Sequence, residues 1–166
     1  VVKPKTAYEL LRMLVGSEIC IRAMSTFDPQ KSSELAAGAI IRQMIDGLVS
    51  TDAEGKTIPA LALKWEPSYE GRVWTFHLRD ANWSNGDPIT AEDFVYSFRR
   101  LADPATAAPN SSYLEDAKIQ GAAEILQGKA KPDTLGVKAL DKKTLQFTLT
   151  APVPYFPDML IQQFTY

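Results

Sequence analysis

The chain has 166 residues, 45% hydrophobic and 23% charged, a composition typical of an ordinary globular domain rather than of a disordered or fibrous segment. Its 18 basic and 20 acidic side chains give a net charge of −2, and no segment concentrates the basic residues as a nucleic-acid-binding surface requires. We therefore expect no nucleic-acid partner.

The chain offers little material for redox or metal chemistry. Cys20 is the single cysteine and His77 the single imidazole, whereas a zinc site needs several such ligands. Glu9 and Arg12 interrupt the apolar stretch near the N-terminus, so it does not have the continuous apolar region of a signal peptide. No apolar run approaches the roughly 20 residues that cross a bilayer as a helix. We expect mature protein with no cofactor and no membrane insertion.

The sequence of the first part of the chain predicts one segment that suits either a strand or a helix, and then one helix. Residues 10–15 suit a strand, although their periodicity also allows a short helix from Tyr8. Asp28-Pro29 then breaks the chain, and Ser32 or Ser33 can cap the helix that follows. Four apolar residues at helical spacing predict its buried stripe: Ile41, Met44, Ile45 and Leu48.

The middle of the chain predicts two turns and a half-buried strand. A turn is expected at residues 52–55, before the apolar residues 60–65. From Val73 the pattern has period two, which places His77 on the wetter face and three apolar side chains on the inner one: Trp74, Phe76 and Leu78. Asn85-Gly86 indicates a tight reversal. We expect Trp83, which precedes this reversal, to pack in the core.

Residues 90–93 resemble a helix capping box, with the Thr90 side chain and the Asp93 carboxylate each serving a backbone N–H of the first turn. Ile89 and Phe94 occupy the positions of a hydrophobic staple. Phe94 also begins an apolar helix face, which Asp103-Pro104 ends.

The last part predicts a loop at residues 106–112, a short helix, a hairpin and a final helix. The short helix carries an apolar stripe and closes at Gly128: Ile119, Ala122, Ala123 and Leu126. The hairpin joins residues 137–140 to residues 145–149, and the final helix starts near Phe156. Hairpins rather than a steady strand–helix–strand alternation favour the α+β class, a mixed sheet packed against helices.

Five blocks, in this order, resemble the oligopeptide-binding family of periplasmic solute-binding proteins, and the oligopeptide and murein-peptide branch is the most similar. They are FDPQ at 27–30, DGL at 46–48, VWTFHLR at 73–79, WSNGDPITAEDFVYS at 83–97 and PVPYF at 152–156. The block at 83–97 is far more specific than a short motif.

The resemblance implies a two-lobed receptor that closes on its ligand. In that scheme residues 1–30 belong to lobe one, residues 31–166 form a smaller α+β domain, and the second lobe is absent from this chain. The resemblance also implies a periplasmic or cell-surface protein that binds peptides and passes them to the membrane permease of an ABC importer. Peptide recognition in the family is by strand addition, and no catalytic residue is implied.

The resemblance places candidate ligand contacts in two loops. Residues Ser32, Ser33, Glu34 and Leu35 align with a segment that meets the peptide backbone, and Ser33 stands where the family often has an acidic residue. Asn110 and Ser111 align with a second loop, in which Asn110 replaces an aromatic ring.

Two other functions remain open. A small hydrolase would need a nucleophile and a base, and no recognisable motif places a Ser, Cys or acidic partner near His77. A stand-alone protein-interaction module would use an exposed sheet edge.

Overall fold

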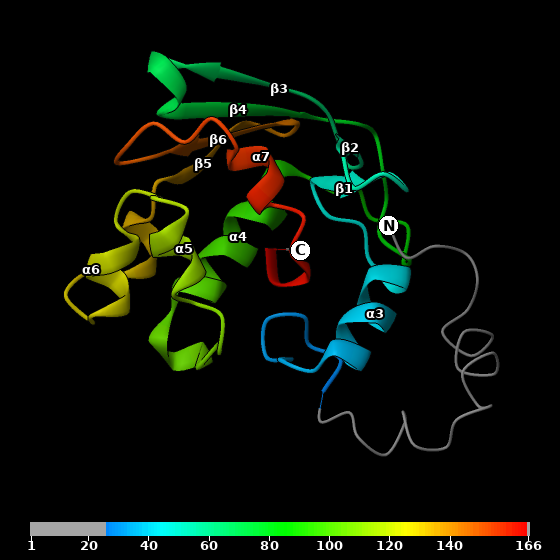
Figure 1. Cartoon of the computed structure of the whole chain (residues 1–166), viewed down its shortest axis with the longest axis horizontal. Helices are drawn as coiled ribbons and strands as arrows, with labels where there is room; N and C mark the ends of the chain where they lie inside the picture. Colours follow the sequence, from blue (N-terminus) through cyan, green and yellow to red (C-terminus); the bar gives the residue numbers. More distant parts are fainter. Residues whose placement is uncertain (1–25, 166) are drawn as a thin grey trace.

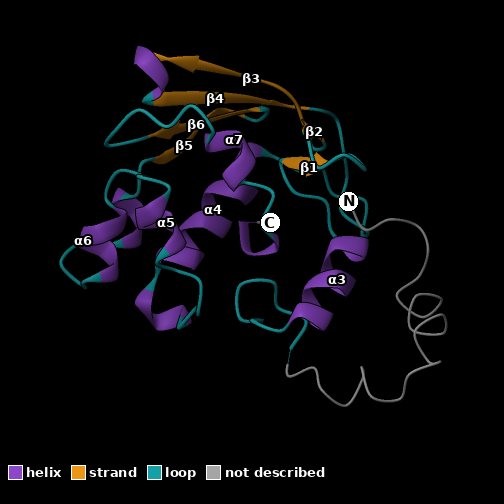
Figure 2. Cartoon of the chain, viewed as in Figure 1, coloured by secondary structure: helices purple, strands orange, loops and turns teal. Residues whose placement is uncertain are grey.

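The computed structural model describes residues 26–165, so the strand or helix predicted for residues 10–15 lies outside the described part. The centre of the fold is an antiparallel four-stranded sheet in the order β3-β4-β6-β5 (Figure 1). Helices lie on one face of this sheet (Figure 2), which confirms the predicted α+β class. The strands are β3 (Ala62–Ser68), β4 (Val73–Leu78), β5 (Val137–Asp141) and β6 (Thr144–Thr148).

Strand β4 follows directly from its alternating sequence. Trp74, Phe76 and Leu78 are buried, while the residues between them, His77 included, are only partly covered. Trp74 lies opposite Phe147 of β6, and Phe76 lies opposite Leu145. The period-two prediction is therefore confirmed, because one face of the strand meets the core and the other does not.

The predicted hairpin of β5 and β6 is also confirmed. The backbone N–H of Lys143 donates to Asp141 Oδ1 at 2.7 Å and closes the turn. This bond is the main reason that the pKa of Asp141 lies below its usual value, and a hydrogen bond from the Thr144 side chain is the second. At the opposite edge of the sheet, β3 exposes Lys64, Glu66 and Pro67.

Helix α4 (Ala91–Ala102) has the predicted limits and the predicted start. The Asp93 carboxylate accepts the Thr90 N–H at 2.7 Å and the Thr90 hydroxyl at 3.0 Å, within a capping box. The helix ends where Asp103 turns extended before Pro104. Its buried face, which includes Phe94 and Phe98, packs on β5 and β6.

Helix α3 (Leu35–Met44) is shorter than predicted and starts differently. Its N-cap is Glu34, so the predicted cap at Ser32 or Ser33 is wrong. Ile45 is already extended, with φ −127° and ψ 139°, so Ile45 and Leu48 are not part of the helical stripe. Ile41 of the predicted stripe is buried as expected, and Ala37 and Ile40 are buried beside it. The chain leaves the helix early because Leu48 and Val49 enter the core at the start of the next strand.

Smaller elements complete the fold. The strands β1 (Val49–Thr51) and β2 (Thr57–Pro59) form a ribbon that closes at the predicted turn, where the Gly55 N–H donates to Asp52 O at 3.2 Å. The remaining helices are α5 (Tyr113–Asp116), which has no predicted counterpart, α6 (Ala122–Leu126) and α7 (Phe156–Met159).

The short helix α6 begins later than predicted. Ile119 forms an isolated bridge with Leu149 instead of a first helical turn, and Gly121 lies at the N-cap with φ +81°. At the other end, the Gly128 N–H donates to Ile125 O at 2.9 Å with φ +71°, which confirms the predicted closure.

One aromatic cluster joins the sheet to the helices. Phe147 of β6 is fully buried and meets Phe98 of α4 edge-on, with ring centroids 4.9 Å apart. Phe76 of β4 and Phe156 of α7 lie 5.6 Å and 5.1 Å from the same ring. Edge-to-face rings at these separations attract each other beyond their burial. The cluster fixes α4, and with it the side chains on its other face.

Candidate functional site

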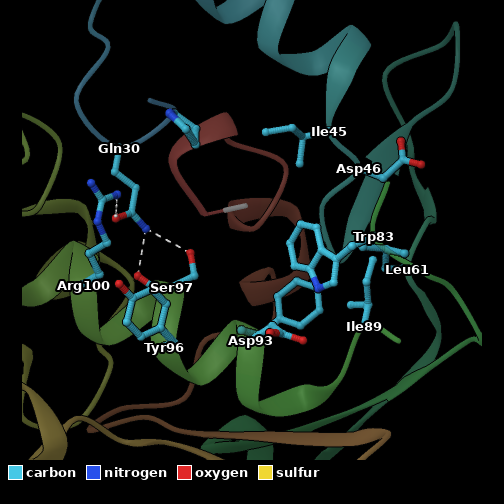
Figure 3. A pocket seen from close by; sticks show the side chains of 12 residues that line it. Gln30, Ile45, Asp46, Leu61, Trp83, Ile89, Asp93, Tyr96, Ser97 and Arg100 are labelled. Atoms are coloured by element: carbon cyan, nitrogen blue, oxygen red, sulfur yellow. Dashed lines mark hydrogen bonds between the residues drawn. The ribbon is translucent and has the colours of Figure 1, made fainter. Parts of the chain in front are cut away.

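A pocket of about 390 Å³ lies between α4 and the segment that precedes α3 (Figure 3). We call it the α4 pocket. Pro29 and Gln30 line it on one side, and Tyr96 and Ser97 line it from α4. Residues far apart in the sequence thus form one surface.

A polar cluster, which we call the clasp, joins the two walls of the pocket: Asp28, Gln30, Ser97 and Arg100. One Arg100 nitrogen donates to Asp28 Oδ1 at 3.0 Å and to Gln30 Oε1 at 2.8 Å, and the second donates to Asp28 Oδ2. Gln30 Nε2 donates to the Ser97 carbonyl at 2.8 Å and the Ser97 hydroxyl at 3.0 Å. The two-pronged guanidinium contact gives this joint a defined geometry.

The clasp shifts the pKa of both its ionised partners toward the charged form. The hydrogen bond from Arg100 lowers the pKa of Asp28, and partial burial opposes this effect. The same bond raises the pKa of Arg100. Each charge favours ionisation of the other.

The floor of the pocket is apolar. Leu61, Ile89 and Phe94 are buried there, whereas Trp83 keeps 40% of its surface exposed at the rim. The prediction of a core position for Trp83 is therefore wrong. The turn itself is as predicted, since the Gly86 N–H donates to Trp83 O at 3.0 Å, but this turn carries the indole to the edge of the core.

The first predicted ligand loop continues directly from the clasp. The Ser32 N–H donates to Asp28 O at 3.0 Å, and the Ser32 side chain is fully buried, with no hydrogen-bond partner for its hydroxyl within residues 26–165. Ser33 is exposed, Glu34 is partly buried, and Leu35 is the first residue of α3. Among Ser32, Ser33 and Glu34, Ser33 is the side chain that solvent reaches most readily.

The second predicted loop precedes α5. Asn110 and Ser111 are each partly exposed, and their carbonyls accept the N–H groups of Tyr113 and Leu114 at 3.1 Å. Both ligand loops lie on the side of α4 that faces away from the sheet (Figure 1). Whether they contact a peptide stays a prediction.

The structure also bears on catalytic, metal-binding and membrane-spanning roles. His77 lies between Lys64 and Thr144 in the sheet register, on the face opposite the aromatic cluster. Within residues 26–165, no group of three or more His, Cys, Asp or Glu side chains is placed to hold a metal ion. No helix in the same part of the chain is long and apolar enough to span a membrane.

Sequence reasoning missed the clasp and the pocket. It treated Asp28-Pro29 only as a chain break, and Arg100 follows it by 72 residues. No local pattern indicates an ion pair over such a separation. The one available signal was the presence of Asp28 and Gln30 in the block at 27–30.

The fold and the sequence together define a class of protein. Residues 56–166 match the model of the bacterial extracellular solute-binding proteins, family 5 (Middle). The chain belongs to this family, which confirms the resemblance seen in the sequence.

Three relatives show what the chain is similar to. It is 49% identical over 131 residues to the periplasmic oligopeptide-binding protein OppA of Haemophilus influenzae, covering 78% of this chain and 24% of that protein. The crystal structure of the same protein in complex with the peptide RPPGFSPFR superposes with a TM-score of 0.82 at 46% identity, over 84% of this chain and 28% of the other.

The other two relatives are from Escherichia coli. The periplasmic murein peptide-binding protein MppA is 43% identical over 81% of this chain and 25% of its own length. The probable deoxycholate-binding periplasmic protein YgiS is 48% identical over 81% of this chain and 25% of its own length. The chain thus spans about a quarter of the length of the curated relatives that it matches.

Proposed function

We propose that the chain is the N-terminal part of an extracytoplasmic solute-binding protein that captures peptides for an ABC importer. We call that longer protein the parent. The observation that carries the proposal is the superposition, at 46% identity, on a relative crystallised with a bound peptide. In the parent, residues 1–30 would belong to lobe one and residues 31–166 would form the smaller domain.

The proposed recognition uses backbone rather than side-chain chemistry. An extended peptide pairs with exposed main-chain groups, and each net hydrogen bond contributes about 1 kcal/mol. A half dozen such bonds with some apolar burial reaches micromolar affinity, about −8 kcal/mol. Ser32, Ser33, Glu34 and Leu35 supply one such segment, and Asn110 and Ser111 supply a second. The clasp supports this role, because it fixes the turn from which the first segment leaves.

One observation favours a second ligand class. The relative that is 48% identical to this chain is named as a probable deoxycholate-binding protein. Its identity to this chain is close to that of the oligopeptide-binding relative, at 49%. The overall identity of this part therefore does not distinguish the two ligand classes, and we infer that the groups which select the ligand lie elsewhere in the parent.

We also infer that the ligand leaves chemically unchanged. The relatives above are all named as binding proteins. His77, the imidazole that a hydrolase would use, lies on the sheet face away from the α4 pocket and from both candidate loops.

Calorimetry on the parent and on the 166-residue chain tests the proposal. Each protein is titrated with a mixed peptide pool and, separately, with deoxycholate. We expect the parent to bind peptides at about micromolar affinity and the isolated chain not to bind. If the parent binds deoxycholate but no peptide, deoxycholate replaces peptides as the proposed ligand. Submicromolar binding by the isolated chain would show that the rest of the parent is not needed for binding.

A pair of variants in the parent tests the first loop. Ser33→Pro removes a backbone donor and Ser33→Ala keeps it, so we expect only the proline variant to lose peptide affinity, by about five- to tenfold for one hydrogen bond. Titration calorimetry measures the affinities, and thermal unfolding checks that both variants stay folded. Equal affinities for the two variants would remove the backbone of Ser33 from the contact.

A further inference from the structure

The turn between β4 and α4 contains Asn85-Gly86, a pair that the proposed function does not use. Every residue from 82 to 88 is exposed. Gly86 has φ +94°, and within the described part of the chain only its two neighbours in sequence lie within 4 Å of where a Cβ would be. Its N–H donates to Trp83 O at 3.0 Å, and a single bond in an exposed turn opens at little cost. Water therefore reaches the main-chain nitrogen of Gly86.

Two hydrogen bonds hold the Asn85 side chain against the main chain that follows it. Asn85 Oδ1 accepts the N–H of Asp87 at 3.0 Å, and Asn85 Nδ2 donates to Asp87 Oδ2 at 2.7 Å. Because Gly86 lies between the two partners, these bonds keep the side-chain amide close to the Gly86 nitrogen. The N–H of Asp87 also draws electron density toward Oδ1 and stabilises a negative charge that forms there.

A side-chain amide held beside a main-chain nitrogen undergoes an intramolecular substitution. Hydroxide removes the proton of the Gly86 N–H, and the nitrogen attacks Cγ of Asn85. The new N–Cγ bond closes a succinimide ring as the Cγ–Nδ2 bond breaks, and the leaving nitrogen takes a proton from water and departs as ammonia. Hydroxide is thereby regenerated. Water then opens the ring at either carbonyl carbon, which gives an aspartyl residue or an isoaspartyl linkage.

The other asparagines of the sequence lack the open approach of Asn85. Each of them precedes a residue whose side chain crowds the main-chain nitrogen that would attack: Asn82 precedes Trp83, and Asn110 precedes Ser111. Glycine is the residue that leaves this nitrogen free of a β-carbon. The chemistry therefore favours Asn85 over the other two.

We propose that Asn85 is a deamidation site, at which the main-chain nitrogen of Gly86 displaces ammonia from the side chain and the turn that carries Trp83 is loosened. The reaction needs water alone, so it does not depend on the proposed function. An aspartyl product places a second carboxylate where Asn85 now donates to Asp87, and like charges at this separation repel each other. An isoaspartyl product also lengthens the main chain, which displaces the bond from Gly86 to Trp83.

Ageing of the peptide-free parent in mildly alkaline buffer tests the site. Samples of native and urea-unfolded parent are digested at mildly acidic pH, and mass spectrometry of the peptides detects the exchange of NH2 for OH. A methyltransferase specific for isoaspartyl groups measures that product. In the native parent we expect Asn85 to convert at least about tenfold faster than Asn82 or Asn110, at a rate proportional to the hydroxide concentration, with both products formed.

Two outcomes would overturn the proposal. If Asn85 of the native parent converts no faster than Asn82, whatever its rate in urea, the folded turn protects the side chain. If only the aspartyl product forms, water attacks the amide directly and Gly86 takes no part. Asn85→Gln is the matched control, because the larger ring that it requires closes more slowly, and this variant should show no exchange on the same time scale.

Variants of the parent test the effect on the turn. Asn85→Asp reproduces the charge of the aspartyl product, and Asn85→Ser removes the amide without adding a charge. We expect the amide hydrogens of Gly86 and Trp83 to exchange with solvent several-fold faster in Asn85→Asp than in Asn85→Ser. Thermal unfolding checks that both variants stay folded. Equal exchange rates would show that the charge does not loosen the turn, and would overturn that part of the proposal.

Discussion

At the scale of single residues, the clasp decides how the N-terminal segment meets α4. Asp28 and Arg100 keep only 25% and 30% of their side chains exposed, and Gln30 is 2% exposed. A partly covered, two-pronged ion pair that also satisfies a buried amide contributes more than a solvent-exposed pair, which adds at most about 1 kcal/mol. The clasp therefore stabilises one arrangement of residues 28–32.

The lowered pKa of Asp28 makes part of this stability dependent on pH. At neutral pH we expect Asp28→Asn to lower the free energy of unfolding by about 1–2 kcal/mol. The carboxylate has a lower pKa in the folded protein, so its contribution is complete above the unfolded pKa of about 3.9 and is lost as the pH falls through the folded value.

Urea unfolding of wild type and Asp28→Asn at several pH values measures the effect. The difference between the two proteins should shrink steadily below about pH 3.9. At neutral pH, adding Arg100→Met to Asp28→Asn should cost about 1–3 kcal/mol more, because it also removes the donor of the buried Gln30 Oε1. A difference that does not change with pH would show that Asp28 acts by packing alone.

At the scale of elements, α4 and α3 differ in how far local sequence determines them. The start and end of α4 are coded within a few residues, by Thr90, Asp93 and Pro104, and both were predictable. Helix α3 has no side-chain cap, and its end is set by Leu48 and Val49 entering the core. Its apolar periodicity continued past Met44, so the sequence alone placed the end of the helix too late.

The capping box of α4 predicts a specific loss of stability. Asp93→Ala removes the carboxylate that accepts the Thr90 N–H and should lower the free energy of unfolding by about 1 kcal/mol. Glu92→Ala is the matched control, because Glu92 lies in the same helical turn and is exposed. Urea unfolding measures both variants, and an equal loss for the two would attribute the effect to first-turn charge rather than to the cap.

At the scale of the whole molecule, one aromatic cluster determines the relative placement of sheet and helices. Its members were predictable one at a time, because Phe76 and Phe147 follow the period-two pattern of their strands and Phe98 lies four residues after Phe94 on the apolar helix face. Their mutual contacts were not, because Phe98 and Phe147 lie 49 residues apart in the numbering and meet only in the folded chain. The same reason hid the α4 pocket, whose walls come from residues 29–30 and from residues 93–100.

Phe147 should be the most costly core side chain to truncate. Phe147→Ala leaves a cavity among three rings and should lower the free energy of unfolding by about 3–5 kcal/mol. Leu140→Ala, on the neighbouring strand and 50% exposed, should change it by less than about 1 kcal/mol. Chemical denaturation monitored by circular dichroism compares them, and similar losses would mean that the cluster is not the centre of the fold.

The edge strand β3 limits how the sheet can grow. Pro67 has no N–H to offer to a further strand, and Lys64 and Glu66 place charges beside the same edge. A strand of a neighbouring chain that paired with β3 would find no N–H donor at Pro67. It would also have to remove water from the charged groups of Lys64 and Glu66, which costs free energy. Stacking of copies into fibres is thereby discouraged at this border.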